Sequence, residues 1–277
     1  MPDNTRRARD EAFWQTFADR YAVEPGPINL ENGYYGIQPK PVLQAFQKNV
    51  ATANKQAARF ARKEYPAIAT AAKKEVAAFL GVLDEEIIIT RNATEALNIA
   101  IQGYPFESGD EVVLNQLDYF SLIETFRMLE KRGTIRVKEF EMPLLPKSED
   151  EIVDIYRKLI TTKTRVILLT HVSNINGLIV PVAKIAAMAK EKGVDVMTDS
   201  AHALGQIQFN VGELNAGHAR HHFGGHQLRG AGAGEVDALG FGLGQRRQLL
   251  EVLGRHLGIH RDDQRHRAHV GHGCEGF

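Results

Sequence analysis

Polar side chains follow the apolar run VDVM, at the point where a buried strand would end. Asp199 and His202 lie in the stretch VDVMTDSAHALG, which is how a parallel strand delivers side chains to a site at its carboxyl end. A carboxylate in that place can pair with a protonated ring nitrogen, and a histidine three residues later can bind a neighbouring oxygen. The alternative is that Asp199 caps the following turn and His202 is an interior histidine with satisfied hydrogen bonds.

A second polar stretch, RNATEALN, follows the apolar run EIIIT and opens a predicted helix. Backbone amides around Ala93 and Glu95, with the hydroxyl of Thr94, form the kind of cradle that a helix start offers to phosphate. The alternative is an ordinary helix cap made by Asn92 or Thr94. The residues alone leave both interpretations open.

Two further strand ends carry candidate ligand contacts. Tyr119, in QLDYFS, follows the run EVVLN and could stack on a planar ligand, or it is a half-buried loop tyrosine. Asn174, in HVSNINGLIVP, follows RVILLT, and its amide could donate to a ligand oxygen or bridge loop backbone. Gly177 is predicted to form a turn after it.

The elements that must position these residues alternate along the chain. Strands are predicted at 86–90, 111–115, 135–140, 165–170 and 194–198. Helices are predicted near Thr94, Ser121, Ser148 and Val182, and earlier at 12–23, from Pro41 to Asn54 and at 67–80, with a loop or turn over 29–41. Apolar strands separated by helices predict an α/β fold, a mostly parallel, doubly wound sheet with helices on both faces.

The composition excludes several classes of function. The 277 residues carry 34 basic and 34 acidic side chains, so the net charge gives no reason to expect nucleic acid or an acidic membrane as a partner. The single cysteine, Cys274, excludes an internal disulfide framework. No run approaches the roughly 18 apolar residues of a membrane span, and the start lacks the apolar core of a secretory signal. We therefore expect a cytoplasmic protein.

The predicted domains are an N-terminal helical segment over 1–27, a large domain over 28–215 and a tail over 216–277. The tail holds nine of the 11 histidines and 14 of the 25 glycines, and no lysine follows Lys192. Its composition suggests the hypothesis that a frameshift near residue 216 has replaced the C-terminal part. Sequencing the locus tests this hypothesis, because a lysine-containing continuation in another frame would support it.

The motifs taken together resemble the class V aminotransferase family, pyridoxal-phosphate enzymes that include cysteine desulfurases and isopenicillin N epimerase-like proteins. The matching stretches are NGYYG, EYPA, TRNATEALN, DYFS, THVSNINGLIVPV and DSAHALG. They lie in order between residues 28 and 215. NGYYG and RNATEALN are most similar to the epimerase-like branch.

The resemblance implies the fold type I of pyridoxal-phosphate-dependent transferases, with pyridoxal 5′-phosphate as cofactor. It implies that Thr94, with the backbone at Ala93 and Glu95, holds the phosphate and that Tyr119 stacks on the ring. Asn174 and His202 would bind near the phenolic oxygen. Asp199 would pair with the pyridinium nitrogen, which keeps the ring an effective electron sink. The implied partners are a small amino-acid substrate and a second copy of the chain in a homodimer.

One element of the family pattern is missing from the chain. The resemblance implies a Schiff-base lysine within about residues 220–230, where the sequence reads RHHFGGHQLRG. Arginine cannot replace that lysine, because its guanidinium does not deprotonate. Lys184, Lys190 and Lys192 are predicted to face solvent. We therefore expect no covalent attachment of the cofactor and an inactive chain.

Other functions remain open from the sequence. The histidines of HARHHFGGH could bind zinc or nickel, although two glycines disfavour the helix that would align them. A non-catalytic interaction protein that retains a cofactor pocket is another alternative. Within the enzyme interpretation, epimerisation, transamination and elimination are all possible, and Cys274 lacks a motif that would mark a desulfurase cysteine.

Overall fold

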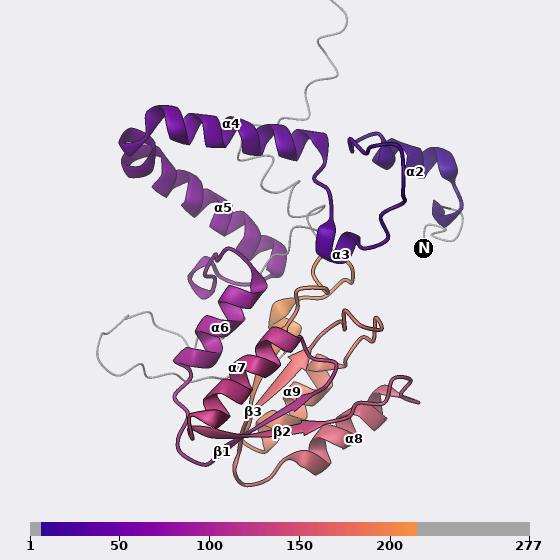
Figure 1. The fold of residues 1–277 in the computed structure, drawn as a ribbon, viewed down its shortest axis with the longest axis vertical. Helices are drawn as coiled ribbons and strands as arrows, with labels where there is room; N and C mark the ends of the chain where they lie inside the picture. The colour runs from indigo at the N-terminus through magenta and orange to yellow at the C-terminus, as the bar shows by residue number, and fades with distance from the viewer. Residues whose placement is uncertain (1–6, 215–277) are drawn as a thin grey trace, which may run out of the picture. The chain divides into compact units, whose positions relative to one another are not determined.

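The computed structural model describes residues 7–214 of the chain (Figure 1). These residues form two compact units, one made of 7–25 and 38–72 and the other of 26–37 and 73–214. The predicted tail over 216–277, with its histidines and the frameshift hypothesis, lies outside the described residues. No helix within the described part is long and apolar enough to cross a membrane.

The first unit is helical. It contains α2 (Glu11–Ala18), α4 (Lys40–Gln56), the π-helical turn η1 (Phe60–Glu64) and the beginning of α5 (Tyr65–Leu80). The predicted helix over 12–23 ends earlier than expected, at Ala18. Beyond this end, the backbone carbonyls of Asp19 and Arg20 accept from Lys40, through its Nζ (2.9 Å) and its amide (2.7 Å) respectively.

The second unit is built on a parallel four-stranded sheet, as predicted. Its strands are β1 (Asp110–Asn115), β2 (Ile135–Phe140), β3 (Thr164–Thr170) and β4 (Asp195–Asp199), in the order β2-β1-β3-β4. Val112 is paired with Val137 on one side and with Val166 on the other. Helices cover both faces of β1 and β3, and the central residues of these strands, 112–114 and 166–169, are apolar and fully buried on both faces.

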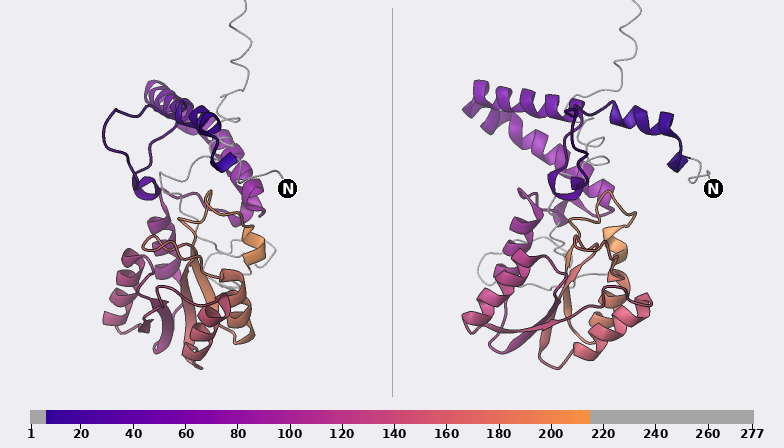
Figure 2. Two further views of the ribbon diagram at one scale, coloured as in Figure 1. Left: turned by 90° about the vertical axis from the view of Figure 1, so that its right-hand side faces the viewer. Right: turned by 45° about the vertical axis from the view of Figure 1, so that its right-hand side comes forward.

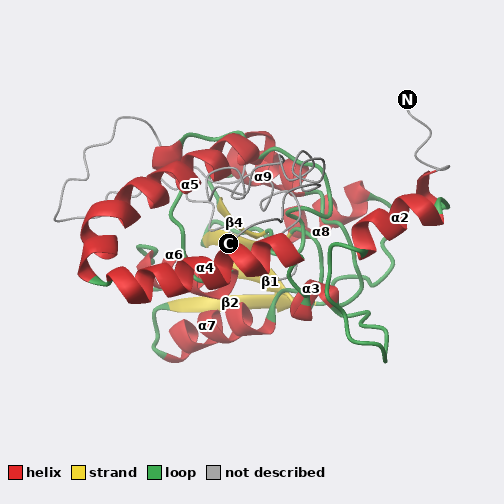
Figure 3. Cartoon of the chain, turned by 90° about the horizontal axis from the view of Figure 1, so that it is seen from above, coloured by secondary structure: helices red, strands yellow, loops and turns green. Residues whose placement is uncertain are grey.

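Helices form a layer on each face of this sheet. Figure 3 shows α7 on one side of the strands and α8 and α9 on the other, and Figure 2 shows the same layers from two further sides. The bounds are α6 (Ala93–Gly103), α7 (Phe120–Lys131), α8 (Glu149–Leu159) and α9 (Val182–Glu191). Leu97 of α6 and Phe126 of α7 pack on one face, whereas Tyr156 of α8 and Ile185 of α9 pack on the other. The prediction of helices on both faces is confirmed.

The helix starts agree with the capping residues in the sequence. Asn92 accepts from the Glu95 amide at the start of α6 (2.9 Å), and Ser148 accepts from the Glu151 amide at the start of α8 (3.2 Å). Each side chain satisfies one of the amides that a helix leaves unpaired at its first turn. The predicted loop over 29–41 contains one short helical turn, α3 (Asn32–Tyr35).

The strand predicted at 86–90 is wrong. The 3-10 turn η2 (Asp84–Glu86) occupies its start, and residues 87–90 have no regular secondary structure. Ile88 is 74% exposed and Ile89 52% exposed. β-branched residues favour a strand only where the backbone finds a partner, and in the part of the chain that the structure describes the four strands pair only with one another. Elsewhere in the second unit, η3 (Val211–Leu214) ends the described chain.

The amino edge of the sheet is fixed by a tyrosine. Tyr104, which follows α6, donates to the Asp195 carboxylate at the start of β4 (2.5 Å), and the Arg165 guanidinium lies 5.9 Å from its ring. We expect Tyr104→Phe to lower the free energy of unfolding by about 1–2 kcal/mol, because a hydrogen bond to a charged group is lost. Urea unfolding followed by circular dichroism measures this. Tyr65→Phe, at an exposed position of α5, is the control, and equal losses in the two variants would contradict the prediction.

Candidate functional site

The carboxyl ends of the parallel strands lie at one edge of the sheet, and the predicted site residues follow them. Tyr119 comes after β1, Asn174 after β3, and Asp199 is the last residue of β4. In open α/β sheets this edge is where ligands bind.

A buried carboxylate joins two of these strand ends. One oxygen of Asp118 accepts from the amide (2.7 Å) and Nδ2 (2.9 Å) of Asn115, and the other accepts from the amide (3.0 Å) and hydroxyl (2.8 Å) of Thr170. Burial raises the pKa of Asp118 to about 7, although the Asn115 and Thr170 bonds lower it. The carboxylate therefore links the ends of β1 and β3 and fixes the backbone just before Tyr119.

Asp199 is buried at the carboxyl end of β4, with 5% of its surface exposed. Its Oδ1 accepts from the Ala201 amide (3.0 Å), so the turn-capping alternative describes one of its two oxygens. Burial raises the pKa of this carboxyl, while the Ala201 bond and the charge of His202 lower it. For Oδ2, the described residues supply no hydrogen bond, which leaves an acceptor for a ligand.

Asn174 lies at the tip of a tight loop. Val172 and Ile179 form an isolated antiparallel bridge, and the chain reverses between them through Gly177, whose φ of +72° confirms the predicted turn. Asn174 is exposed, and its Nδ2 donates to the hydroxyl of Tyr34 (3.1 Å).

His202 and Tyr119 approach the same tyrosine. The ring of His202 lies 5.5 Å from that of Tyr34, measured between centroids. Burial is the largest cause that raises the pKa of the Tyr34 phenol. The interaction with Tyr119 raises it further, and the charge of Asp199 has a smaller effect in the same direction. Tyr34 belongs to α3, so a segment from early in the chain contacts the carboxyl edge of the sheet.

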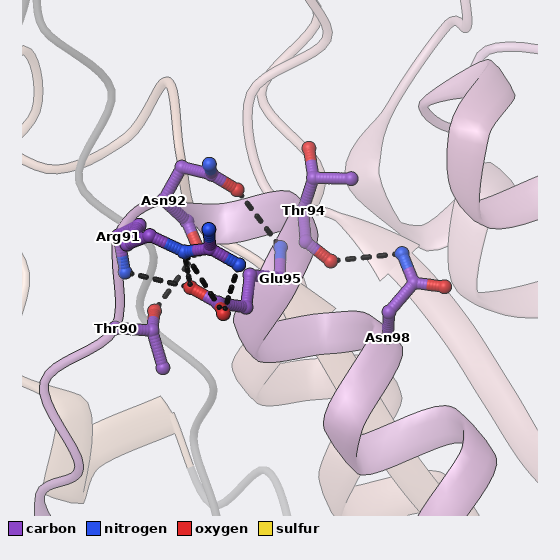
Figure 4. A network of polar contacts seen from close by, with 6 residues as sticks. All are labelled: Thr90, Arg91, Asn92, Thr94, Glu95 and Asn98. Carbon is purple, nitrogen blue, oxygen red and sulfur yellow. Dashed lines mark hydrogen bonds and ion pairs between the residues drawn. The ribbon is translucent and has the colours of Figure 1, made fainter.

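The start of α6 carries the predicted phosphate contacts. Arg91 donates from its guanidinium (2.7 Å) and its amide (2.9 Å) to the Glu95 carboxylate, whose pKa this partner lowers to about 2. The Glu95 amide is bound by Asn92, so the capping alternative is present here. Figure 4 shows the Thr94 side chain pointing away from the Arg91–Glu95 pair.

His171, directly after β3, is also buried at this edge. Its Nδ1 lies 3.3 Å from the Ser200 hydroxyl, and its ring packs edge-on against Phe209. Burial lowers the pKa of this imidazole to about 4, so it is neutral at pH 7. Its amide donates to the Asp199 carbonyl (2.9 Å), which holds the ends of β3 and β4 together.

The structure thus brings Asn174 and His202 into contact with Tyr34, and it places Tyr119 and Asp199 near enough to raise the pKa of its phenol. Sequence reasoning missed Tyr34 and Asp118 as site residues. The available signals were the position of Tyr34 within the NGYYG motif and the acid of DYFS directly after a strand. Among residues 7–214, no group of three or more His, Cys, Asp or Glu side chains is arranged to hold a metal ion.

The last lysines of the chain lie outside this cluster. Lys184, Lys190 and Lys192 are exposed, as predicted, and Lys184 forms ion pairs with Glu149 (2.9 Å) and Asp150 (3.1 Å).

Known sequences resemble this chain over most of its described part. The family model of class V aminotransferases matches residues 36–234. Isopenicillin N epimerase of Streptomyces clavuligerus is 24% identical over 203 residues, which are 73% of this chain and 51% of that protein. The mitosomal cysteine desulfurase of Encephalitozoon cuniculi is 32% identical over 151 residues, 52% of this chain and 34% of that one. The chain spans about half or less of the length of these relatives.

Solved structures share the fold. The cysteine desulfurase CsdA (S-sulfonic acid) from Escherichia coli is 25% identical with a TM-score of 0.57, over 67% of this chain and 47% of that one. The cystine C–S lyase C-DES, in complex with its reaction product cysteine persulfide, is 21% identical with a TM-score of 0.62, and the match covers 67% of this chain and 50% of that one. The family match covers more than half of the chain and includes every strand of the sheet. The chain therefore belongs to the class V aminotransferase family.

Proposed function

We propose that the carboxyl edge of the sheet binds pyridoxal phosphate, the cofactor expected for a class V aminotransferase, for chemistry on an amino acid. The observation that supports this most directly is Asp199, a buried carboxylate at a strand end with one oxygen open to a ligand. When bound, the cofactor supplies an electron sink for charge that develops at the substrate's α-carbon.

The environment of Asp199 fits a protonated ring nitrogen. Burial disfavours the charged carboxylate and raises its pKa. A cationic N–H donor on Oδ2 would reverse this effect, because an opposite charge within hydrogen-bond distance stabilises the carboxylate. Asp199 would in turn keep the ring nitrogen protonated.

The start of α6 fits a phosphate group. The first hydrogen bond of the helix runs from the Ala96 amide to the Asn92 carbonyl (3.2 Å). The amides of Ala93 and Thr94 therefore have no carbonyl acceptor within the helix. These amides, the Thr94 hydroxyl and the positive end of the helix dipole favour an anion. The Glu95 amide donates to the Asn92 side chain, and the Glu95 carboxylate pairs with Arg91. Glu95 therefore stabilises the start of the helix.

Three side chains are proposed to hold the ring. Tyr119, at the N-cap position of α7, would stack on its face, while Asn174 and His202 would bind the side that carries the phenolic oxygen. All three are half-buried or exposed, so a ligand can reach them without unfolding the sheet.

The cofactor would be held without a covalent bond. No lysine follows Lys192 in this chain, and the lysines on α9 and at its end are exposed. We therefore propose that the chain binds the cofactor as the free aldehyde and does not turn over an amino acid. The relatives include an epimerase and cysteine desulfurases, and we propose the epimerase-like branch as the origin of the site because of NGYYG.

Substitution of Asp199 tests the proposed function. Asp199→Asn is expected to raise the Kd of pyridoxal phosphate about 10- to 100-fold, the loss typical of a hydrogen bond between charged groups. Asp154→Asn is the control, because Asp154 is an exposed acid of α8 that is not part of the proposed site. Absorbance and fluorescence titrations of the purified chain measure the Kd.

The titration also separates the alternatives. Absence of saturable binding by the unsubstituted chain would reject the proposed site, and equal affinities of the two variants would reject the role of Asp199. Borohydride reduction followed by intact mass is expected to show no specific adduct. An adduct on one lysine would contradict non-covalent binding and reveal a substitute nucleophile.

A further inference from the structure

We propose that Tyr34 is a positioning residue of this site, which sets the orientation of both Asn174 and His202. The inference rests on the proposed cofactor function. It concerns a tyrosine from α3, more than 130 residues before the two side chains that it orients.

The first contact fixes the amide of Asn174. Tyr34 accepts a hydrogen bond from Nδ2 of Asn174 (3.1 Å). An exposed asparagine on a loop tip otherwise samples several rotamers, and ordering its side chain costs conformational entropy when a ligand binds. The hydrogen bond to Tyr34 orders the Asn174 side chain before the cofactor binds, so binding loses less conformational entropy. It also leaves Oδ1 and the second N–H of the amide available to a ligand.

The second contact fixes the ring of His202. The two aromatic rings are 5.5 Å apart in a tilted arrangement, which is within the range of favourable ring pairs. The neighbouring residue, Gly33, makes this approach possible. A Cβ atom at position 33 would lie 3.0 Å from Cε1 and 3.2 Å from Nδ1 of His202. The α3 turn is therefore packed closely against His202, and the lack of a side chain at Gly33 permits it.

The surroundings of the Tyr34 phenol favour its neutral form. Burial is the largest cause that raises the pKa of this phenol, and Tyr119 and Asp199 raise it further. A neutral hydroxyl can accept from Asn174 and donate to another oxygen at the same time. Tyr34 thus contacts Asn174 and His202, although it is 38% exposed and belongs to none of the strands.

Removal of the single hydroxyl tests the role. Tyr34→Phe keeps the ring and is expected to raise the Kd of pyridoxal phosphate about fivefold, as for one neutral hydrogen bond. Tyr35→Phe is the matched control, since Tyr35 is the next residue of the same turn and is 70% exposed. We expect the control to leave the Kd unchanged within about twofold. Urea unfolding of both variants should match the unsubstituted chain.

A double-mutant cycle distinguishes positioning from general packing. If Tyr34 acts through Asn174, Tyr34→Phe should have no further effect on the Kd in an Asn174→Ala background. The absorbance of the bound cofactor gives a second readout: the pH at which its phenolic oxygen ionises should shift in Tyr34→Phe and in Asn174→Ala in the same direction. Additive effects on the Kd, or an unshifted ionisation in Tyr34→Phe, would overturn the positioning role.

The outcomes also separate this inference from the proposed function. If Asp199→Asn weakens binding and Tyr34→Phe does not, the cofactor site stands and the role of Tyr34 is rejected. If the unsubstituted chain does not bind pyridoxal phosphate, the proposed function fails and the positioning role fails with it.

Discussion

Asp118→Asn is expected to lower the free energy of unfolding by about 2–3 kcal/mol, because hydrogen bonds of a buried acid are lost and buried donors are left without an acceptor. Both oxygens of Asp118 accept two hydrogen bonds each, from Asn115 and Thr170. If the introduced NH2 group faces Asn115, it meets two N–H donors and both bonds are lost. If it faces Thr170, the hydroxyl can accept from it, but the Thr170 amide loses its acceptor. The donors left without an acceptor are buried, which adds a desolvation cost.

Chemical unfolding of the full chain by urea, followed by far-ultraviolet circular dichroism, measures this loss. Asp154→Asn is the control, because Asp154 lies on the exposed side of α8 and pairs only with Arg157 in the described ion pairs. Its substitution should change the free energy of unfolding by less than about 0.5 kcal/mol. Coincident unfolding curves for Asp118→Asn and the unsubstituted chain would show that the carboxylate does not stabilise the sheet.

The second large effect is a loss of stability in acid that originates from His171. Burial lowers the pKa of this imidazole from 6.5 to about 4 in the folded chain. Between these two values the unfolded state binds a proton that the folded state does not bind, so stability falls as the pH falls through this window. The shift corresponds to about 3 kcal/mol, and partial solvent screening reduces the expected effect to roughly 2 kcal/mol.

His171→Gln isolates this contribution, since glutamine does not titrate and keeps an amide that can bind the Ser200 hydroxyl. The measurement is the difference in the free energy of unfolding between the two chains from pH 7 to pH 4. On lowering the pH the unsubstituted chain should lose roughly 2 kcal/mol relative to the variant. Subtracting one chain from the other cancels the contributions of titrating groups that both chains share. One of these groups is Asp118, whose raised pKa stabilises the folded chain as the pH falls. A constant difference across this range would exclude His171 as the cause.

Much of the fold could be predicted from the sequence. Four strands were placed within one residue at each end, because runs of valine, isoleucine and leucine are buried on both faces of β1 and β3. Capping residues such as Ser148 located the helix starts. The family resemblance is also confirmed, because the family model of class V aminotransferases matches residues 36–234.

The errors have a common physical cause. Residues 86–90 have the composition of a strand, yet pairing depends on a partner that local composition does not specify. Tyr34 was missed for the same reason, since its contacts with Asn174 and His202 span large separations in the sequence. Spacing could place Asp199 at a strand end, but not show which of its oxygens the Ala201 amide would bind.

The Asp118 carboxylate also sets an order of events during synthesis of the chain. Asn115 lies three residues before it, whereas Thr170 lies 52 residues after it. At typical ribosome speeds these 52 residues take roughly 3–10 s to appear. Before Thr170 has been synthesised, two of the four hydrogen bonds that Asp118 accepts in the folded chain cannot form. The hydrogen bonds that join the carboxyl ends of β1 and β3 through Asp118 therefore cannot form before β3 has been synthesised.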